Sequence, residues 1–205
     1  MRRQLFLIIF LLFSLNAILS QQDQEKPTYL LGPENWRFER IDLPLPFASQ
    51  IAHKGFEELR FAPGMFNVDA ETYFTYVFLI EIQDNPKFLE KDLKALLVAY
   101  YKGLCKAVAS SKKFDIDYEE IEVNLKHTKS KNKFSTKYDA NVVFFDTFND
   151  GRRLLLKMDI EVISNKKENK SHIIALVSPK SKPDLVWTRL EKVKTGIKIE
   201  RHVNN

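Results

Sequence analysis

The stretch that decides the fold runs from residue 73 to residue 108 and reads YFTYVFLIEIQDNPKFLEKDLKALLVAYYKGLCKAV. Its first part, Tyr73 to Ile82, is apolar at both alternating sets of positions, which is typical of a central strand covered on both faces. In the second part, apolar residues recur three or four positions apart up to Val108, with Asn85 as a cap and Pro86 in the first turn. We therefore expect a buried strand followed by an amphipathic helix of about six turns.

After this helix the apolar period changes from about 3.6 to about 2, which indicates strands. We expect four of them, at residues 120–126, 134–148, 154–162 and 172–177, and a hairpin turn at Asn149-Asp150-Gly151. Before the helix, residues 56–61 are expected as a strand that ends at the Pro63-Gly64 turn. A short helix from Pro183 to Val193 and a last strand, 197–202, complete the order.

This order predicts an α+β fold. We expect a curved antiparallel sheet with one long helix and a short C-terminal helix packed over one face. Residues 36–205 are long enough for a single domain with a sizeable core, and residues 21–35 are expected as a polar N-terminal arm.

The first 20 residues have the three parts of a secretory signal peptide. Arg2 and Arg3 give the charged start, residues 5–15 form an apolar block, and Ser20 is a small residue before the expected cut. The block of about 11 residues is shorter than the roughly 20 residues that a membrane span needs. We therefore expect an exported protein, periplasmic or extracellular, with no transmembrane segment after cleavage.

Basic residues are unevenly distributed along the chain. Residues 21–125 contain 12 basic and 18 acidic side chains, whereas residues 126–205 contain 18 basic and 9 acidic ones. Because clustered lysines attract anions, one expected partner is an anionic envelope component such as a polysaccharide or a lipid head group. Solvated charge spread over one fold explains the same pattern. Aromatic residues are not interleaved with these lysines, which argues against nucleic acid.

The spacings that common metal and cofactor sites need are missing. No two of the four histidines are closer than about 30 residues, so none has zinc-ligand spacing on a helix. The acidic run 115–122 fails as a calcium-binding EF-hand loop, because Glu120 stands where the turn needs glycine. Cys105 lies on the apolar face of the predicted helix, where a thiol is expected to be structural. We expect no cofactor and no metal.

Four charged residues on predicted strands are the candidate site. Glu57, Glu58 and Arg60 belong to the strand at 56–61, and Asp146 lies within the apolar run 142–148. If Asp146 points inward, its carboxylate needs a partner such as Arg60. The alternative is that Asp146 begins the hairpin turn at the solvated end of its strand.

The segment Gly55-Phe56-Glu57-Glu58-Leu59-Arg60-Phe61-Ala62-Pro63-Gly64, with Leu45-Pro46-Phe47-Ala48 before it and Phe145-Asp146-Thr147-Phe148 after it, resembles an uncharacterised family of small exported bacterial proteins. The resemblance covers most of the chain after the signal peptide. It implies export from a bacterial cell. No activity is attached to that family, so the resemblance implies no catalytic residue.

Two functions of different class follow from these observations. The first is a non-enzymatic domain of the cell envelope that binds a partner, or binds an apolar small ligand between the sheet and the long helix. The second is a hydrolase-type enzyme with a dispersed site made of Glu57, Glu58, Arg60 and Asp146. The lack of a recognised catalytic motif favours the first, and convergence of the four side chains in one polar pocket would favour the second.

We expect export to remove residues 1–20, because a signal peptidase cuts after a small residue that follows the apolar block. Mass spectrometry of protein expressed in a bacterial host checks this, and the expected first residue is Gln21. A mass that still includes Met1 would contradict the expected location.

Overall fold

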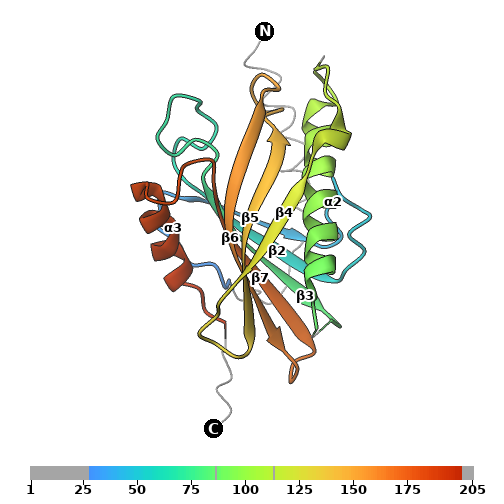
Figure 1. The fold of residues 1–205 in the computed structure, drawn as a ribbon, viewed down its shortest axis with the longest axis vertical. Coiled ribbons are helices and arrows are strands. Elements are labelled where there is room, and N and C mark those ends of the chain that lie inside the picture. Colours follow the sequence, from blue (N-terminus) through green and yellow to red (C-terminus); the bar gives the residue numbers. More distant parts are fainter. Residues whose placement is uncertain (1–27, 86, 113, 200–205) are drawn as a thin grey trace, which may run out of the picture.

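The computed structural model describes residues 28–85, 87–112 and 114–199 (Figure 1). Its centre is a curved seven-stranded antiparallel sheet with the strand order β1-β2-β3-β7-β6-β5-β4. The strands are β1 (Arg37–Asp42), β2 (Gly55–Phe61), β3 (Tyr76–Gln83), β4 (Val123–Thr128), β5 (Ser135–Phe145), β6 (Arg153–Asn165) and β7 (Lys170–Ser178). The helices are α2 (Glu90–Ala109), the short 3-10 helix η2 (Tyr118–Glu120) and α3 (Leu185–Thr195). The predicted α+β class is confirmed.

Strands β3 and β7 pair in the middle of the sheet, from Tyr76 opposite Val177 to Gln83 opposite Lys170. Nearly every side chain on the two strands is buried, whichever face it points to. Two-sided burial requires a covering layer on each face of the sheet. The predicted central strand is therefore confirmed.

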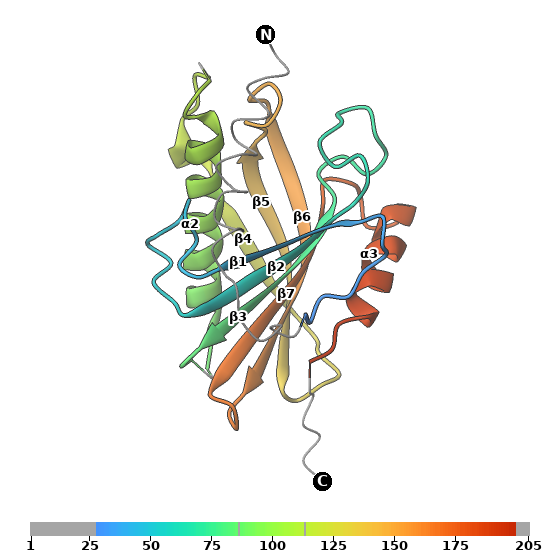
Figure 2. The same ribbon diagram turned by 180° about the vertical axis from the view of Figure 1, so that it is seen from behind.

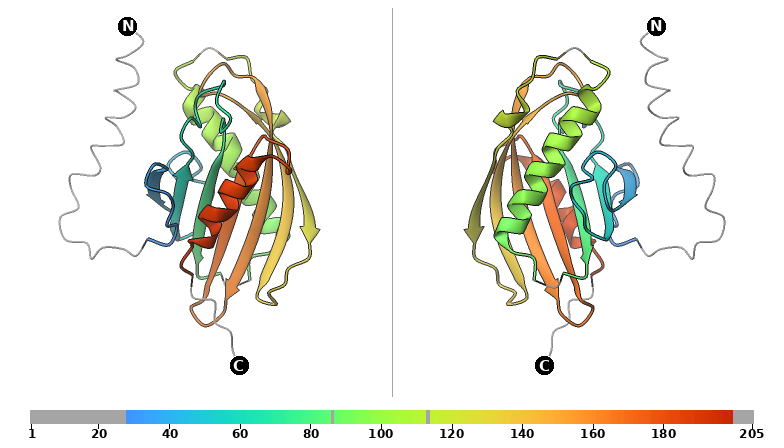
Figure 3. Two further views of the ribbon diagram at one scale, coloured as in Figure 1. Left: turned by 90° about the vertical axis from the view of Figure 1, so that its left-hand side faces the viewer. Right: turned by 90° about the vertical axis from the view of Figure 1, so that its right-hand side faces the viewer.

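Helices α2 and α3 cover opposite faces of the sheet, as the edge-on views show (Figure 3). Leu97 and Tyr101 of α2 belong to the same core as Phe78 of β3. Trp187 and Leu190 of α3 belong to a second core, which lies on the other side of β3. The expected placement of both helices over one face is thus wrong, because the two-sided apolar strands need cover on both faces.

Three local features differ from the predictions. Residues 37–42, which were not predicted as a strand, form the edge strand β1 beside β2. The strand at residues 73–82 begins only at Tyr76, after a turn in which Phe74 has a φ of 49°. Helix α2 begins at Glu90 rather than near Pro86, and the Leu89 N–H donates to the Asp92 carboxylate at 3.0 Å. That carboxylate satisfies one of the free donors of the first turn.

Part of the expected N-terminal arm is packed rather than loose. The segment before β1 lies beside α3 (Figure 2), and Leu30 in it is fully buried. Leu30 forms an isolated β-bridge with Ile197, and the Lys198 N–H donates to the Tyr29 carbonyl at 3.0 Å. The predicted last strand is not formed over residues 197–199, where Ile197 makes only that isolated bridge. Residues 200–202 lie outside the described residues, as does the whole predicted signal peptide.

Among the described residues, no helix has the length and apolar character needed to cross a membrane.

Leu155 and Leu156 of β6 test the observed register. Leu156 is fully buried against the α2 face, whereas Leu155 points to the other face and is 49% exposed. We expect Leu156→Ala to lower the free energy of unfolding by about 2–5 kcal/mol, because it leaves a cavity in the core. Leu155→Ala should lower it by less than about 1 kcal/mol. Urea unfolding of both variants measures the difference, and equal losses would contradict the register.

Candidate functional site

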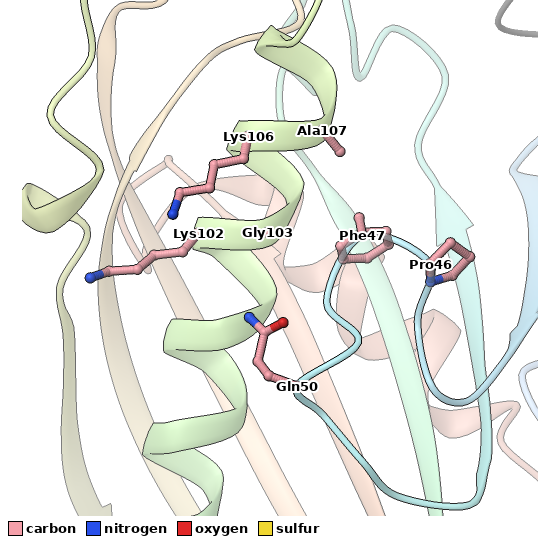
Figure 4. Close-up of a pocket in the computed structure, with 7 residues that line it drawn as sticks. All are labelled: Pro46, Phe47, Gln50, Lys102, Gly103, Lys106 and Ala107. Carbon is pink, nitrogen blue, oxygen red and sulfur yellow. The ribbon is translucent and has the colours of Figure 1, made fainter.

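A surface groove lies between α2 and the loop of residues 43–51 (Figure 4). Its walls are formed by Pro46, Phe47, Gln50, Lys102, Gly103, Lys106 and Ala107. Loop and helix touch at Gly103, where a Cβ atom would lie 2.1 Å from the Phe47 carbonyl oxygen. Only glycine permits so close an approach. The groove therefore depends on a loop that rests directly on the helix backbone.

Phe47 separates the groove from a layer of buried tyrosines. Its ring packs edge-on against Tyr100 of α2, with centroids 5.1 Å apart. Tyr100 stacks on Phe78 of β3 at 6.0 Å, and the hydroxyls of Tyr76 and Tyr101 are hydrogen-bonded at 2.7 Å. These side chains fill the space between α2 and the sheet, and Phe47 is the residue of the groove that contacts them.

Glu57 reaches the same layer from β2. Its side chain is fully buried, and no hydrogen bond of good geometry reaches either carboxylate oxygen. Burial raises the pKa of Glu57 to about 8, while the nearby Tyr100 hydroxyl opposes part of this rise and the Glu39 carboxylate adds to it. The carboxyl is therefore mostly protonated at neutral pH. A buried carboxyl that is hydrogen-bonded only poorly, here by Tyr100, costs stability, so its presence in a core requires an explanation.

The tyrosine hydroxyls of this layer keep their protons. Burial raises the pKa of Tyr76, Tyr100 and Tyr101, and the Glu57 carboxyl raises each of them further. The layer thus offers neutral O–H groups and one carboxyl. Such groups can hold a hydrogen-bonding ligand in an otherwise apolar environment.

Glu58 and Arg60 lie on the opposite face of β2, where they hold the backbone of the chain itself. The Glu58 carboxylate accepts hydrogen bonds from the N–H groups of Tyr29 at 3.0 Å and Leu30 at 2.7 Å, and it pairs with Arg40 at 2.8 Å. Arg60 donates to the Leu30 carbonyl at 3.1 Å. These two charged residues therefore fasten the segment before β1 to the sheet.

Asp146 holds the hairpin turn that follows β5. Its carboxylate accepts hydrogen bonds from the N–H groups of Phe148 and Asn149, both at 3.1 Å, and from the Tyr73 hydroxyl. The expected role at the start of the turn is confirmed. The expected solvated position is wrong, because Asp146 is fully buried, and its partner is Tyr73 rather than Arg60.

The four candidate residues are not brought together. Glu57 faces α2, Glu58 and Arg60 face the side of α3, and Asp146 lies beyond the end of β5. The convergence that would favour a dispersed hydrolase site is not observed. Glu57 does not line the groove, but it interacts with Tyr100, against which Phe47 of the groove packs.

Sequence reasoning missed a second buried charged cluster, on the α3 face. Glu81 of β3 lies 3.3 Å from His172 and 3.3 Å from Lys170, and it accepts a hydrogen bond from Gln83 at 3.1 Å. Although burial opposes it, these partners lower the pKa of Glu81 to about 2. In the sequence, this cluster is indicated only by a glutamate inside an apolar strand. Its partners Lys170 and His172 lie on β7, about 90 residues further along the chain, so local patterns could not identify them.

Cys105 has a structural environment. Its thiol is buried and donates to the Phe145 carbonyl at 3.4 Å, and burial raises its pKa to about 11. A thiol that keeps its proton is a poor nucleophile. Within residues 28–85, 87–112 and 114–199, no three His, Cys, Asp or Glu side chains are grouped as they would be around a metal ion.

No family model matches the chain, and no curated protein matches it.

Glu57 should make stability depend on pH. Its pKa of about 8 in the folded protein exceeds its ordinary value of 4.5, so the unfolded chain loses this proton first as pH rises. The contribution of Glu57 to the free energy of unfolding should therefore fall between about pH 4.5 and pH 8. Glu57→Gln cannot ionise, so the variant should gain stability relative to wild type as pH rises through this window.

Urea unfolding at several pH values checks this expectation. Glu34→Gln, at an exposed position, is the matched control and should give a profile parallel to that of wild type. A Glu57→Gln profile that is also parallel to wild type between pH 5 and pH 8 would contradict the assignment.

Proposed function

We propose that this protein is a non-enzymatic binding domain that works outside the cytoplasm. Its ligand is a small, mainly apolar molecule with one hydrogen-bond donor, held between α2 and the sheet. The observation that carries the proposal is the buried Glu57 carboxyl, whose hydrogen bond with the Tyr100 hydroxyl is too poorly aligned to satisfy either oxygen. A donor on the ligand would supply the missing hydrogen bond.

The groove supports an apolar ligand. Pro46, Phe47 and Ala107 give it apolar walls, and the tyrosine layer behind Phe47 is aromatic. Sites of this kind are mostly apolar, with a few polar groups that fix orientation. Glu57 is the polar group here, and because its carboxyl is mostly protonated it would favour a neutral hydroxyl or amine over a fixed cation.

Phe47 is the gate of the proposed site. Its loop is joined to α2 by the contact at Gly103 and by the hydrogen bond from the Gln50 side chain to the Ala99 carbonyl at 3.4 Å. The ligand would take the place of the Phe47 ring against Tyr100. This exchange preserves an aromatic contact on Tyr100 while satisfying Glu57.

Export is part of the proposal on the basis of the sequence. The signal peptide predicted in residues 1–20 and the resemblance to exported bacterial proteins both support a periplasmic or extracellular location. An envelope protein meets membrane-derived and excreted apolar compounds, which suits the proposed ligand chemistry.

The test uses N-phenyl-1-naphthylamine, an apolar fluorophore with one N–H donor, and 1-phenylnaphthalene, which lacks the donor. We expect the protein to bind the amine more tightly than the hydrocarbon. Glu57→Leu should weaken binding of the amine about tenfold, which corresponds to one buried hydrogen bond, and should leave binding of the hydrocarbon unchanged. Fluorescence titration of both probes measures this, and the hydrocarbon shows that the variant keeps its site.

Phe47→Ala and Phe66→Ala form a matched pair of controls. Phe47 stands at the proposed gate, whereas Phe66 contacts Phe61 and Phe148, away from the groove. Phe47→Ala should speed association of the amine, and Phe66→Ala should not. Failure of the wild-type protein to bind either probe, or equal behaviour of both Phe variants, would contradict the proposal.

A further inference from the structure

Lysines gather at one end of the sheet. The connection between β4 and β5 carries Lys129, Lys131 and Lys133, and the connection between β6 and β7 carries Lys166 and Lys167. Antiparallel pairing puts both connections at the same end, at the bottom of Figure 1. We call these five residues the lysine end.

The two lysine-bearing connections leave neighbouring strands of the sheet. The Ser164 N–H, at the end of β6, donates to the Phe134 carbonyl at 3.1 Å. Ser135 of β5 pairs with Ile163, and Asn165 pairs with Lys170 across the next hairpin. The lysine end therefore lies at the ends of adjacent strands, although its residues come from two separate parts of the sequence.

Positive charge exceeds negative charge at the lysine end, because Glu168 is the acidic residue of these two connections and it pairs with Lys170 at 3.7 Å. None of its five lysines forms an ion pair with a carboxylate in the part of the chain that the structure describes. The acids of residues 115–122 lie at the other end of β4, before its first residue. An anionic surface would therefore attract this end of the sheet through its five lysines.

We propose that the lysine end docks on the surface of an anionic lipid bilayer. This inference is independent of the ligand site, which lies along α2. Lysines on two connections at the tip of a sheet present point charges to a broad surface rather than lining a groove, and lysine is a strongly hydrated point charge without the fork geometry that selects one anion.

An exposed tip also suits a bilayer better than a polysaccharide chain. The grooves between α2 and the loop 43–51 and along β4 to β6 contain none of these five lysines. Phe134 is half-buried beside them, with the Lys133 ammonium 5.0 Å from its ring centroid. An aromatic ring next to lysines is typical of the boundary between water and lipid, where the ring contacts the interface and the charges contact the head groups.

The experiment uses protein purified after expression of the full chain. Vesicles of mixed phosphatidylglycerol and phosphatidylcholine are compared with vesicles of phosphatidylcholine alone by co-sedimentation. We expect binding to the mixed vesicles only, and weaker binding as salt rises, because salt screens charges beyond about 10 Å at 0.1 M. Equal binding to both kinds of vesicle would overturn the proposal.

Two triple variants remove the same charge from opposite ends of the sheet. Lys129→Gln/Lys131→Gln/Lys133→Gln should lower the vesicle partition constant about a hundredfold, since each lysine near an anionic bilayer contributes about fivefold. The control, Arg152→Gln/Arg153→Gln/Lys180→Gln, changes the other end and should lower it less than about fivefold. Equal losses in the two variants would overturn the proposal.

A soluble anionic polysaccharide, dextran sulfate, separates the two sources of negative charge. Protein that binds dextran sulfate but does not sediment with the mixed vesicles would overturn the proposal in favour of a polysaccharide partner. The circular dichroism spectrum and urea midpoint of each triple variant should match those of wild type, because the substituted side chains are on the surface.

Discussion

Strands β3 and β7 run side by side through the middle of the molecule, and both bury their side chains on both faces. A strand pair of this kind cannot have water on either side, because each buried apolar Å² contributes about 25 cal/mol. One face is covered by α2, and the other by α3 together with the segment before β1. The rest of the fold depends on this central constraint, since it turns a sheet with two helices into three layers.

In the layer under α2, the proposed binding site and a stable core would use the same space. Most of the layer consists of aromatic side chains in contact, which stabilises the helix on the sheet. Glu57 breaks this pattern, because a carboxyl without a good hydrogen bond lowers stability where an apolar residue would raise it. Native sequences break local rules mainly at functional positions. The groove, Phe47 and Tyr100 form a continuous path to that one exception.

Three other buried carboxylates have a different physical character, and a fourth, Glu161, pairs with Lys194 at 3.0 Å. Glu58, Glu81 and Asp146 are all buried, and each accepts hydrogen bonds or has a cationic partner. A buried charge that is paired in this way holds neighbouring segments in one arrangement, and removing one partner destabilises the fold. Glu58 therefore holds the segment before β1 in place, Glu81 holds strand β7, and Asp146 holds the β5–β6 hairpin.

Sequence and tertiary structure determined different things about this protein. The strands after α2, the long helix and the turn role of Asp146 follow from apolar period and turn chemistry, because those signals are local. The opposite placement of the helices does not, since it depends on which strands become neighbours. Glu57 and Glu58 are adjacent in sequence, yet one meets Tyr100 and the other the backbone of Leu30. Successive side chains along a strand point to opposite faces of the sheet. Which distant residues each of them contacts is determined only by the tertiary structure.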